Sequence, residues 1–253
     1  MSLKQMSRFR AAAIHLMISA FIAAAVIALM LAVWYPPSLF DAMGGKKLLV
    51  LIIGIDVAVG PLITLIIFDT RKKELAFDLA VIAALQFTAL SYGIYAMHSG
   101  RPVFVVFTED RFVVVSAAEV DEETLSQAPA EFRTLPENGP IVVAADMPGD
   151  MRQRMILFFT GLSGIGVQNL PKYYVSYEER LAEVRAASRP LQRLSNLRAE
   201  DEIQLVQAAA RSRQPLESMR YLPLRTRYAT LTALVDGASG RFLFILPIDP
   251  RDG

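Results

Sequence analysis

The sequence has 253 residues, of which 53% are hydrophobic, a share too high for an ordinary soluble domain. Its charges are divided unevenly: residues 1–97 carry eight Lys or Arg and five Asp or Glu, whereas residues 98–253 carry 18 and 20. This balance excludes a nucleic-acid-binding surface of the usual basic kind. The absence of cysteine excludes disulfides and thiolate metal sites.

Three apolar runs in the first hundred residues are long enough to cross a membrane. They cover residues 11–33, 48–68 and 75–97, and a helix needs about 20 residues to cross about 30 Å of hydrocarbon. The first run is too long for the apolar part of a signal peptide, so we expect it to stay attached. The sequence therefore predicts a membrane protein with three transmembrane helices.

Basic residues beside these runs predict how the chain is oriented. The N-terminal tail, residues 1–10, and the loop 69–74 together carry six Lys or Arg, while three lie near the membrane on the opposite side. The positive-inside rule then places the tail in the cytoplasm. We expect a multi-pass protein of the bacterial inner membrane, in contact with membrane lipid, whose C-terminal domain is periplasmic.

Four polar side chains inside the spans need partners, because a charged group at the centre of a bilayer costs about 2.5–3.5 kcal/mol. Counting about 1.5 Å per residue along antiparallel helices brings Asp56 level with Gln86, and His15 level with Asp78. We expect both pairs to hydrogen-bond. Two interpretations stay open. Either the pairs hold the helices together, or Asp56 faces a cleft that receives a partner helix.

A proline interrupts the second span one turn after Asp56. Pro61, in the pair Gly60-Pro61, removes the hydrogen bond to the carbonyl of Val57 and predicts a kink. Thr64 can return its hydroxyl to a freed carbonyl.

The rest of the chain predicts an α+β domain over residues 99–253, after a tail over 1–10 and a three-helix transmembrane domain over 11–98. The predicted strands are 103–107 and 111–116, which form a hairpin, then 141–145, and a final hairpin of 227–235 with 241–248. The predicted helices are 150–159, 177–187 and 199–213.

The catalytic motifs that the sequence offers are incomplete. The run GLSGI at 161–165 lacks the final glycine of a nucleophile elbow and the lysine of a phosphate loop. His98 alone beside the domain excludes a two-histidine metal site within it. An intramembrane aspartyl protease is disfavoured because Asp56 and Asp78 differ by about 13 Å in depth, too far to share a proton. We expect no enzyme, no metal and no cofactor.

Several blocks of sequence resemble one known family, the type IV pilin accessory proteins (the TfpX/TfpZ group). They are WYPPSLF at 34–40, GIDVAVGPLIT at 54–64, FDLAVIAALQ at 77–86 with YG at 92–93, RPVFVVF at 101–107, DRFVVV at 110–115, QNLPKYY at 168–174 and LPLR at 222–225. The likeness extends over most of residues 8–250 and is weakest at 117–165 and 185–215. Ser38 departs from the small turn residue or glycine that we would expect there.

The resemblance implies a non-enzymatic accessory factor, chaperone-like, for the stability of a type IV pilin or the assembly of its pilus. The implied partners are the cognate major pilin and other pilus-assembly proteins of the inner membrane. The pilin helix would lie beside the hairpin of the second and third spans, and Tyr173 and Tyr174 are candidate contacts for the pilin head, unless they pack the domain core. The alternative is a membrane sensor, which the short cytoplasmic segments disfavour.

Overall fold

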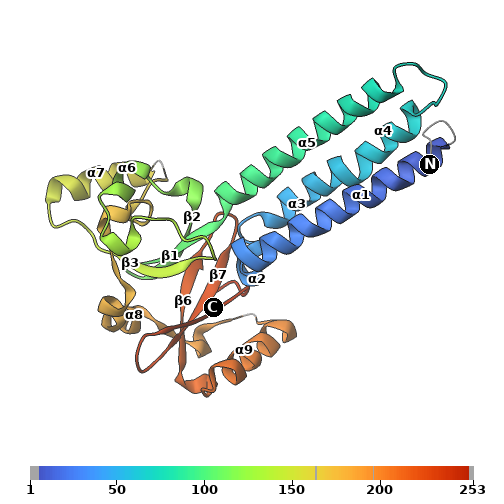
Figure 1. Ribbon diagram of the computed structural model, residues 1–253. Helices are drawn as coiled ribbons and strands as arrows, with labels where there is room; N and C mark the ends of the chain where they lie inside the picture. The colour runs from blue at the N-terminus through green and yellow to red at the C-terminus, as the bar shows by residue number, and fades with distance from the viewer. Residues whose placement is uncertain (1–5, 163, 196, 251–253) are drawn as a thin grey trace. The chain divides into compact units, whose positions relative to one another are not determined.

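The computed structural model describes residues 6–162, 164–195 and 197–250 (Figure 1). The chain divides into two compact units. The first unit comprises residues 1–34 and 44–99, and the second comprises residues 35–43 and 100–253.

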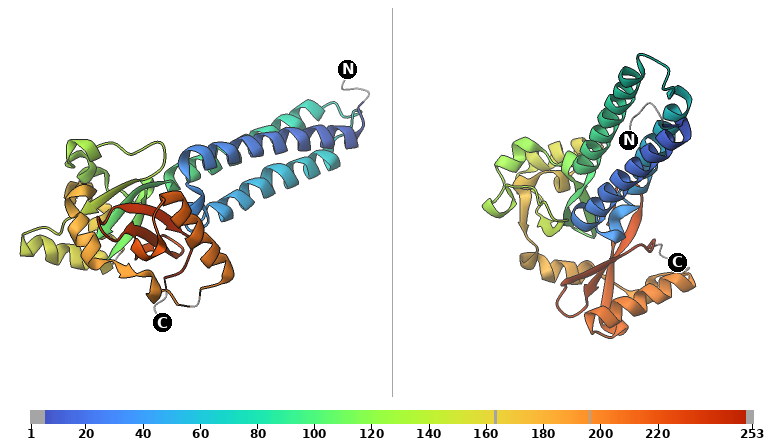
Figure 2. Two further views of the ribbon diagram at one scale, coloured as in Figure 1. Left: turned by 90° about the horizontal axis from the view of Figure 1, so that it is seen from below. Right: turned by 45° about the vertical axis from the view of Figure 1, so that its right-hand side comes forward.

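The first unit consists of helices that are long and apolar enough to cross a membrane, as predicted. Within the described residues there are three: Arg8–Trp34, Gly45–Ile67 and Leu75–Gly100. In sequence order their segments are α1 Arg8–Leu29, the π-helical η2 Met30–Trp34, α3 Gly45–Ile53, the π-helical η3 Gly54–Val59, α4 Gly60–Ile67 and α5 Leu75–Gly100. α1 runs beside α3 and α4, and α5 runs alongside them (Figures 1 and 2).

The second unit is built on one mixed sheet, which confirms the predicted combination of helices and strands. Within the described residues the strands follow the order β4-β3-β1-β2-β6-β7-β8, and β5 also pairs with β6. Their bounds are β1 Pro102–Thr108, β2 Arg111–Ser116, β3 Ile141–Ala145, β4 Tyr174–Ser176, β5 Arg189–Pro190, β6 Met219–Arg225, β7 Thr230–Asp236 and β8 Phe242–Leu246. The β1–β2 and β7–β8 hairpins and β3 lie where the sequence placed strands.

Strand β6 is central in the sheet although it contains Pro223, a residue that argues against a central strand. On one side β6 pairs along its whole length with β7. On the other side β5 pairs with residues 220–221 and β2 pairs with residues 224–225. Pro223 falls in the gap between these two partners, so its missing N–H removes no bond to β5 or β2. No strand was predicted over these residues from the sequence.

Helices cover the sheet in two groups, each over its own buried core. The helices of the second unit are α2 Pro37–Phe40, α6 Glu122–Ser126, α7 Met151–Leu162, α8 Leu181–Ala187 and α9 Ala199–Ser212. One core includes Phe104 of β1, Val143 of β3, Phe132 and Tyr174. The other packs α9 against β6, β7 and β8. The predicted helices 150–159 and 199–213 are α7 and α9, whereas the predicted helix 177–187 begins as a 3-10 turn and becomes α8 only at Leu181.

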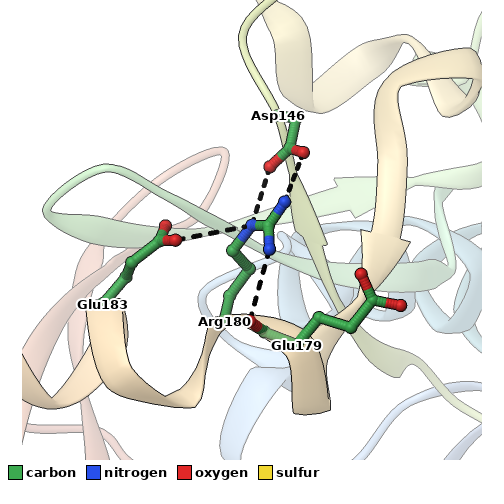
Figure 3. A network of polar contacts seen from close by, with 4 residues as sticks. All are labelled: Asp146, Glu179, Arg180 and Glu183. Atoms are coloured by element: carbon green, nitrogen blue, oxygen red, sulfur yellow. Dashed lines mark hydrogen bonds and ion pairs between the residues drawn. The ribbon is translucent and has the colours of Figure 1, made fainter.

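An arginine joins the end of β3 to the start of α8. Arg180 donates two hydrogen bonds to Asp146, from Nε at 2.9 Å and from Nη2 at 2.5 Å. Figure 3 shows the fork-to-fork geometry of this pair, with Glu183 as a third member at 3.6 Å from Arg180 Nε. Such bidentate pairs fix orientation as well as contributing energy. We assign this network to the architecture of the domain.

The loop between the first two spans is folded into the second unit. In residues 35–43, the side chains of Tyr35 and Leu39 are 1% and 0% exposed. The hydroxyl of Thr226 donates to the carbonyl of Ala42 at 2.9 Å, and the N–H of Tyr228 donates to the same carbonyl at 3.2 Å. Burial raises the pKa of Tyr35 to about 12, against the opposing effect of Arg101. Residues 35–43, assigned from the sequence to the transmembrane domain, are thus part of the β-sheet unit.

Leu39→Ala should therefore destabilise the second unit, although residue 39 lies some sixty positions before β1. Emptying a fully buried leucine site costs about 2–5 kcal/mol. Thermal unfolding of the purified full-length protein in detergent measures the effect, with Ser38→Ala, at a partly exposed neighbour in the same loop, as the matched control. An unchanged unfolding temperature for Leu39→Ala would contradict the packing described here.

Candidate functional site

The second span changes its backbone register just before a proline. In η3 the N–H of Gly60 donates to the carbonyl of Ile55, five residues back. In this register the next N–H would reach the carbonyl of Asp56, but the next residue is Pro61, which has no N–H. The carbonyl of Asp56 is therefore left without a backbone donor in the middle of an apolar helix. The sequence had predicted that the carbonyl of Val57 would be freed, because it assumed an α-helical register.

A side chain from the third span supplies the missing donor. Gln86 Nε2 donates to the carbonyl oxygen of Asp56 at 3.2 Å. This approach requires a glycine at position 60, because a Cβ atom there would overlap the Gln86 amide group. An unsatisfied backbone group in hydrocarbon costs several kcal/mol, so the bond from Gln86 offsets the main penalty of Pro61.

The same glutamine also contacts the first span. Its Oε1 lies 2.7 Å from His15 Nε2, and His15 Nδ1 lies 2.6 Å from Thr64 Oγ1. Because the Gln86 nitrogen acts as a donor, its oxygen accepts from His15 Nε2–H. In the tautomer that carries its proton on Nε2, Nδ1 accepts a hydrogen bond from the Thr64 hydroxyl. A hydrogen-bond chain runs from Thr64 through His15 and Gln86 to Asp56. These four residues, from all three spans, are called the polar cluster below.

The carboxyl group of Asp56 is the part of the polar cluster that its neighbours leave unused. Its side chain is 7% exposed, and the buried Oδ1 atom has no hydrogen-bond partner among the residues that the structure describes. Burying a polar atom without a partner costs free energy. The carboxyl therefore retains an unused capacity to accept a hydrogen bond within the membrane-spanning part of the chain.

Of the two predicted intramembrane pairs, one is formed and the other is not. Asp56 and Gln86 are joined as expected, but through the backbone carbonyl of Asp56. The pair of His15 with Asp78 is not formed: His15 bonds Thr64 and Gln86, while Asp78 forms an ion pair with Lys72 at 3.6 Å.

The pair of His15 with Asp78 is missing because α1 begins earlier than the sequence predicted. Ser7 caps this helix by accepting from the N–H of Arg10 at 3.3 Å, so α1 begins at Arg8 instead of Ala11. His15 consequently lies about one turn deeper than the sequence placed it. The expected bond from the Thr64 hydroxyl to a freed carbonyl is also absent from the described contacts, because that hydroxyl meets His15 instead.

Apolar clefts flank the third span on both sides. The first, here the α1–α5 cleft, has a volume of about 250 Å³ and is lined by residues that include His15, Thr64, Ile82 and Gln86. The second, the α4–α5 cleft, has a volume of about 450 Å³. It is lined by Ile55, Val59, Gly60, Ile63, Ile67, Phe77, Asp78, Val81, Ile82, Leu85 and Gln86. Only 6% of the most apolar window of the third span is buried, against 28% for the second span.

The two candidate tyrosines of the second unit have different surroundings. Tyr174 is 1% exposed; its hydroxyl donates to the carbonyl of Gln168 and its ring packs edge-on against Phe104 at 5.0 Å. Tyr174 is therefore a core residue, and its proposed role as a surface contact is wrong in this structure. Tyr173 remains partly exposed, with its hydroxyl 3.4 Å from Gln153 Oε1.

Comparison with known proteins assigns the chain to a family. The family model described as fimbrial assembly protein FimB matches residues 4–44. The fimbrial assembly protein of serogroup I from Dichelobacter nodosus is 34% identical over 214 residues, which are 83% of this chain and 83% of that protein. The chain belongs to the fimbrial assembly protein family. The protein of serogroups C1 and C2 from the same organism is 39% identical over 117 residues, 46% of this chain and 89% of that protein.

Family membership confirms the resemblance to the type IV pilin accessory proteins at the level of the family. No solved structure matches the chain. The segment of this chain that the family model matches, residues 4–44, contains α1 with His15 and the whole loop 35–43. In the part of the chain that the structure describes, no three His, Asp or Glu side chains gather as a metal site requires.

Two features of this family member were missed from the sequence. One is the bond between His15 and Thr64, which requires the lateral directions of two helices to be known. The other is the outer face of α7, where Met151, Met155 and Phe159 recur at helical spacing and remain exposed. That spacing is visible in the sequence and would have indicated an unpartnered apolar face.

Gly60→Ala should disrupt the polar cluster by displacing the Gln86 amide. We expect Gly60→Ala and Gln86→Ala each to lower the stability of the helix bundle by about 1 kcal/mol, less than the cost of a bare carbonyl in hydrocarbon, because the unfolded reference state also finds hydrogen-bond partners. The double variant should be no worse than Gln86→Ala alone. Unfolding in mixed detergent micelles measures the differences. Gly54→Ala is the matched control, because a Cβ at Gly54 would meet no atom within 4 Å. Additive losses in the double variant would contradict the assigned contact.

Proposed function

We propose that this protein is a non-enzymatic accessory factor of the bacterial inner membrane that holds a type IV pilin subunit before pilus assembly. Its relatives are named fimbrial assembly proteins, which supports a role in pilus biogenesis. The finer proposal, a chaperone-like hold on the pilin, depends mainly on one structural observation. That observation is the pair of apolar clefts beside the third span.

The clefts suit a partner that is itself an apolar helix. The resemblance implies a pilin with a single apolar helix and an outer head. Leu85 and Phe77 line the α4–α5 cleft yet are 67% and 70% exposed, so they are available to a further helix. Gly60 also lines this cleft, and small residues permit the close approach on which helix association in lipid depends.

The way in which α5 is held explains how the clefts can remain open. Gln86 ties α5 to the other spans through directional bonds to His15 and Asp56. Moving apolar side chains out of lipid gains no hydrophobic free energy, because lipid tails are as apolar as leucine, so apolar surfaces associate only where they pack closely. Polar bonds can therefore hold the bundle together while apolar surfaces beside them stay available for exchange between lipid and a partner helix.

The unused oxygen of Asp56 adds a second attraction for a partner. A donor on an incoming helix would satisfy Oδ1 only if the spans around it separated, because the atom is buried and Asp56 lines neither cleft. Polar side chains contribute about 0.6 kcal/mol on average to helix association in a membrane, and up to about 2 kcal/mol. This is enough to favour a bound helix and small enough to release it again.

The proposed orientation has the N-terminus in the cytoplasm and the β-sheet unit in the periplasm. It is supported by the excess of Lys and Arg in the tail 1–10 and the loop 69–74. A pilin head emerging from the inner membrane would then share a compartment with the β-sheet unit.

A reporter enzyme that is active only in the periplasm tests the orientation. Fused to the C-terminal end of the chain it should be active, and inserted after Lys73 it should be silent, because the positive-inside rule assigns these points to opposite sides. Reporter activity normalised to protein level is the measurement. The reverse pattern would overturn the orientation and leave the family assignment untouched.

Photocrosslinking in cells tests the proposed pilin contact. A photoreactive residue at Leu85, inside the α4–α5 cleft, should give an adduct with the combined mass of this protein and one pilin. The matched control is Met17, which is 73% exposed on α1 and lines neither cleft. Equal adducts from both positions would indicate random collision in the membrane, and adducts from neither would contradict the pilin hold.

A further inference from the structure

The helix α7 exposes an apolar face that the core of its domain does not use. Met151, Met155, Phe158 and Phe159 are between 57% and 69% exposed. They recur at positions i, i+4, i+7 and i+8, which places them along one side of the helix. α7 lies at the periphery of its unit in Figures 1 and 2.

The opposite side of α7 is fixed to the domain, so the exposed face cannot turn inward. Leu157 is 7% exposed. Arg154 Nε donates to the carbonyl of Pro148 at 2.6 Å, and the Tyr173 hydroxyl donates to Gln153 Oε1 at 3.4 Å. Burying one large apolar side chain is worth about 1.5–3 kcal/mol, so an exposed row of four is a strong sign of an interaction surface.

The charge around α7 differs from that of the segment before it. Residues 151–177 contain Arg152, Arg154 and Lys172 and no acidic residue. Residues 117–150 contain eight Asp or Glu and one basic residue, Arg133. The apolar face therefore lies within a cationic stretch of the chain, although Asp150 stands at the start of α7 and Glu109, Asp110 and Arg111 line the same hollow as Phe158. Its complement is an apolar layer bordered by negative charge.

We propose that α7 is an interfacial helix, whose Met and Phe side chains enter the headgroup region of a membrane containing anionic lipid. A helix with a large apolar face and basic residues beside it has the composition of such helices. The domain also begins directly after a predicted transmembrane span, because α5 ends at Gly100 and β1 begins at Pro102. This short connection gives the domain a high effective concentration at the lipid surface.

The consequence would be a second membrane contact, separate from the three spans. The β-sheet unit is already joined to the spans at three places along the chain, and an interfacial contact would further restrict its orientation to the bilayer. The proposal concerns lipid only and does not depend on the identity of any pilus subunit.

The cysteine-free sequence allows a direct test with the full-length protein. Met155→Cys, labelled with an environment-sensitive fluorophore, is reconstituted at one copy per nanodisc in phosphatidylcholine with phosphatidylglycerol. Gln207→Cys, an exposed position on α9, is the matched control. We expect the label at 155 to be quenched several-fold less by aqueous iodide than the label at 207, and several-fold more by nitroxide lipid.

Two further conditions separate lipid from other occupants of the face. In phosphatidylcholine alone, and for Arg152→Gln in the mixed lipid, protection at position 155 should decrease; protection equal in all three would overturn the role of anionic headgroups. Equal iodide access at positions 155 and 207 would overturn the proposal. Protection that arises only after a purified pilin or a second copy is added would also overturn it, in favour of a protein-docking face.

Discussion

Backbone hydrogen bonding inside the membrane is the constraint on which the first unit depends. Pro61 has no N–H group to donate, and in the hydrocarbon region no water can supply that hydrogen bond. The π-helical segment before Pro61 transfers the loss to the carbonyl of Asp56, and Gln86 supplies the donor from α5. Gly60 is required because the amide must approach the backbone closely. His15 then orients the amide, so the first span participates in satisfying a defect of the second.

This mode of assembly determines what the surface of the bundle can do. Helices that associate through apolar packing in lipid must fit closely, which leaves no free groove. Here Gln86 holds α5 by directional bonds, and its flanks retain apolar clefts lined by exposed side chains such as Leu85. The bonds of Gln86 thus stabilise the bundle and also leave space beside the third span. The proposed hold on a pilin helix depends on the second.

The parts of the fold that were predictable are those governed by local pattern. Apolar length identified the spans, and alternating strands around short turns identified the β1–β2 and β7–β8 hairpins. Pairing between distant segments was not accessible, because β6 tolerates Pro223 only through the spacing of β5 and β2. Within the site, Asp56 and Gln86 were correctly brought together, but His15 was assigned the wrong partner since a depth count contains no lateral direction.

The loop 35–43 interrupts the first unit in the sequence and belongs to the second. The chain passes from the first unit to the second at residue 35, returns at residue 44, and leaves again at residue 100. Three crossings therefore connect the units, and the loop between two of them is buried around Leu39 and bonded to Thr226. The residues that connect α1 to α3 are therefore part of the core of the β-sheet unit. The two units are thus joined at three places along the chain, and neither is one continuous segment of the sequence.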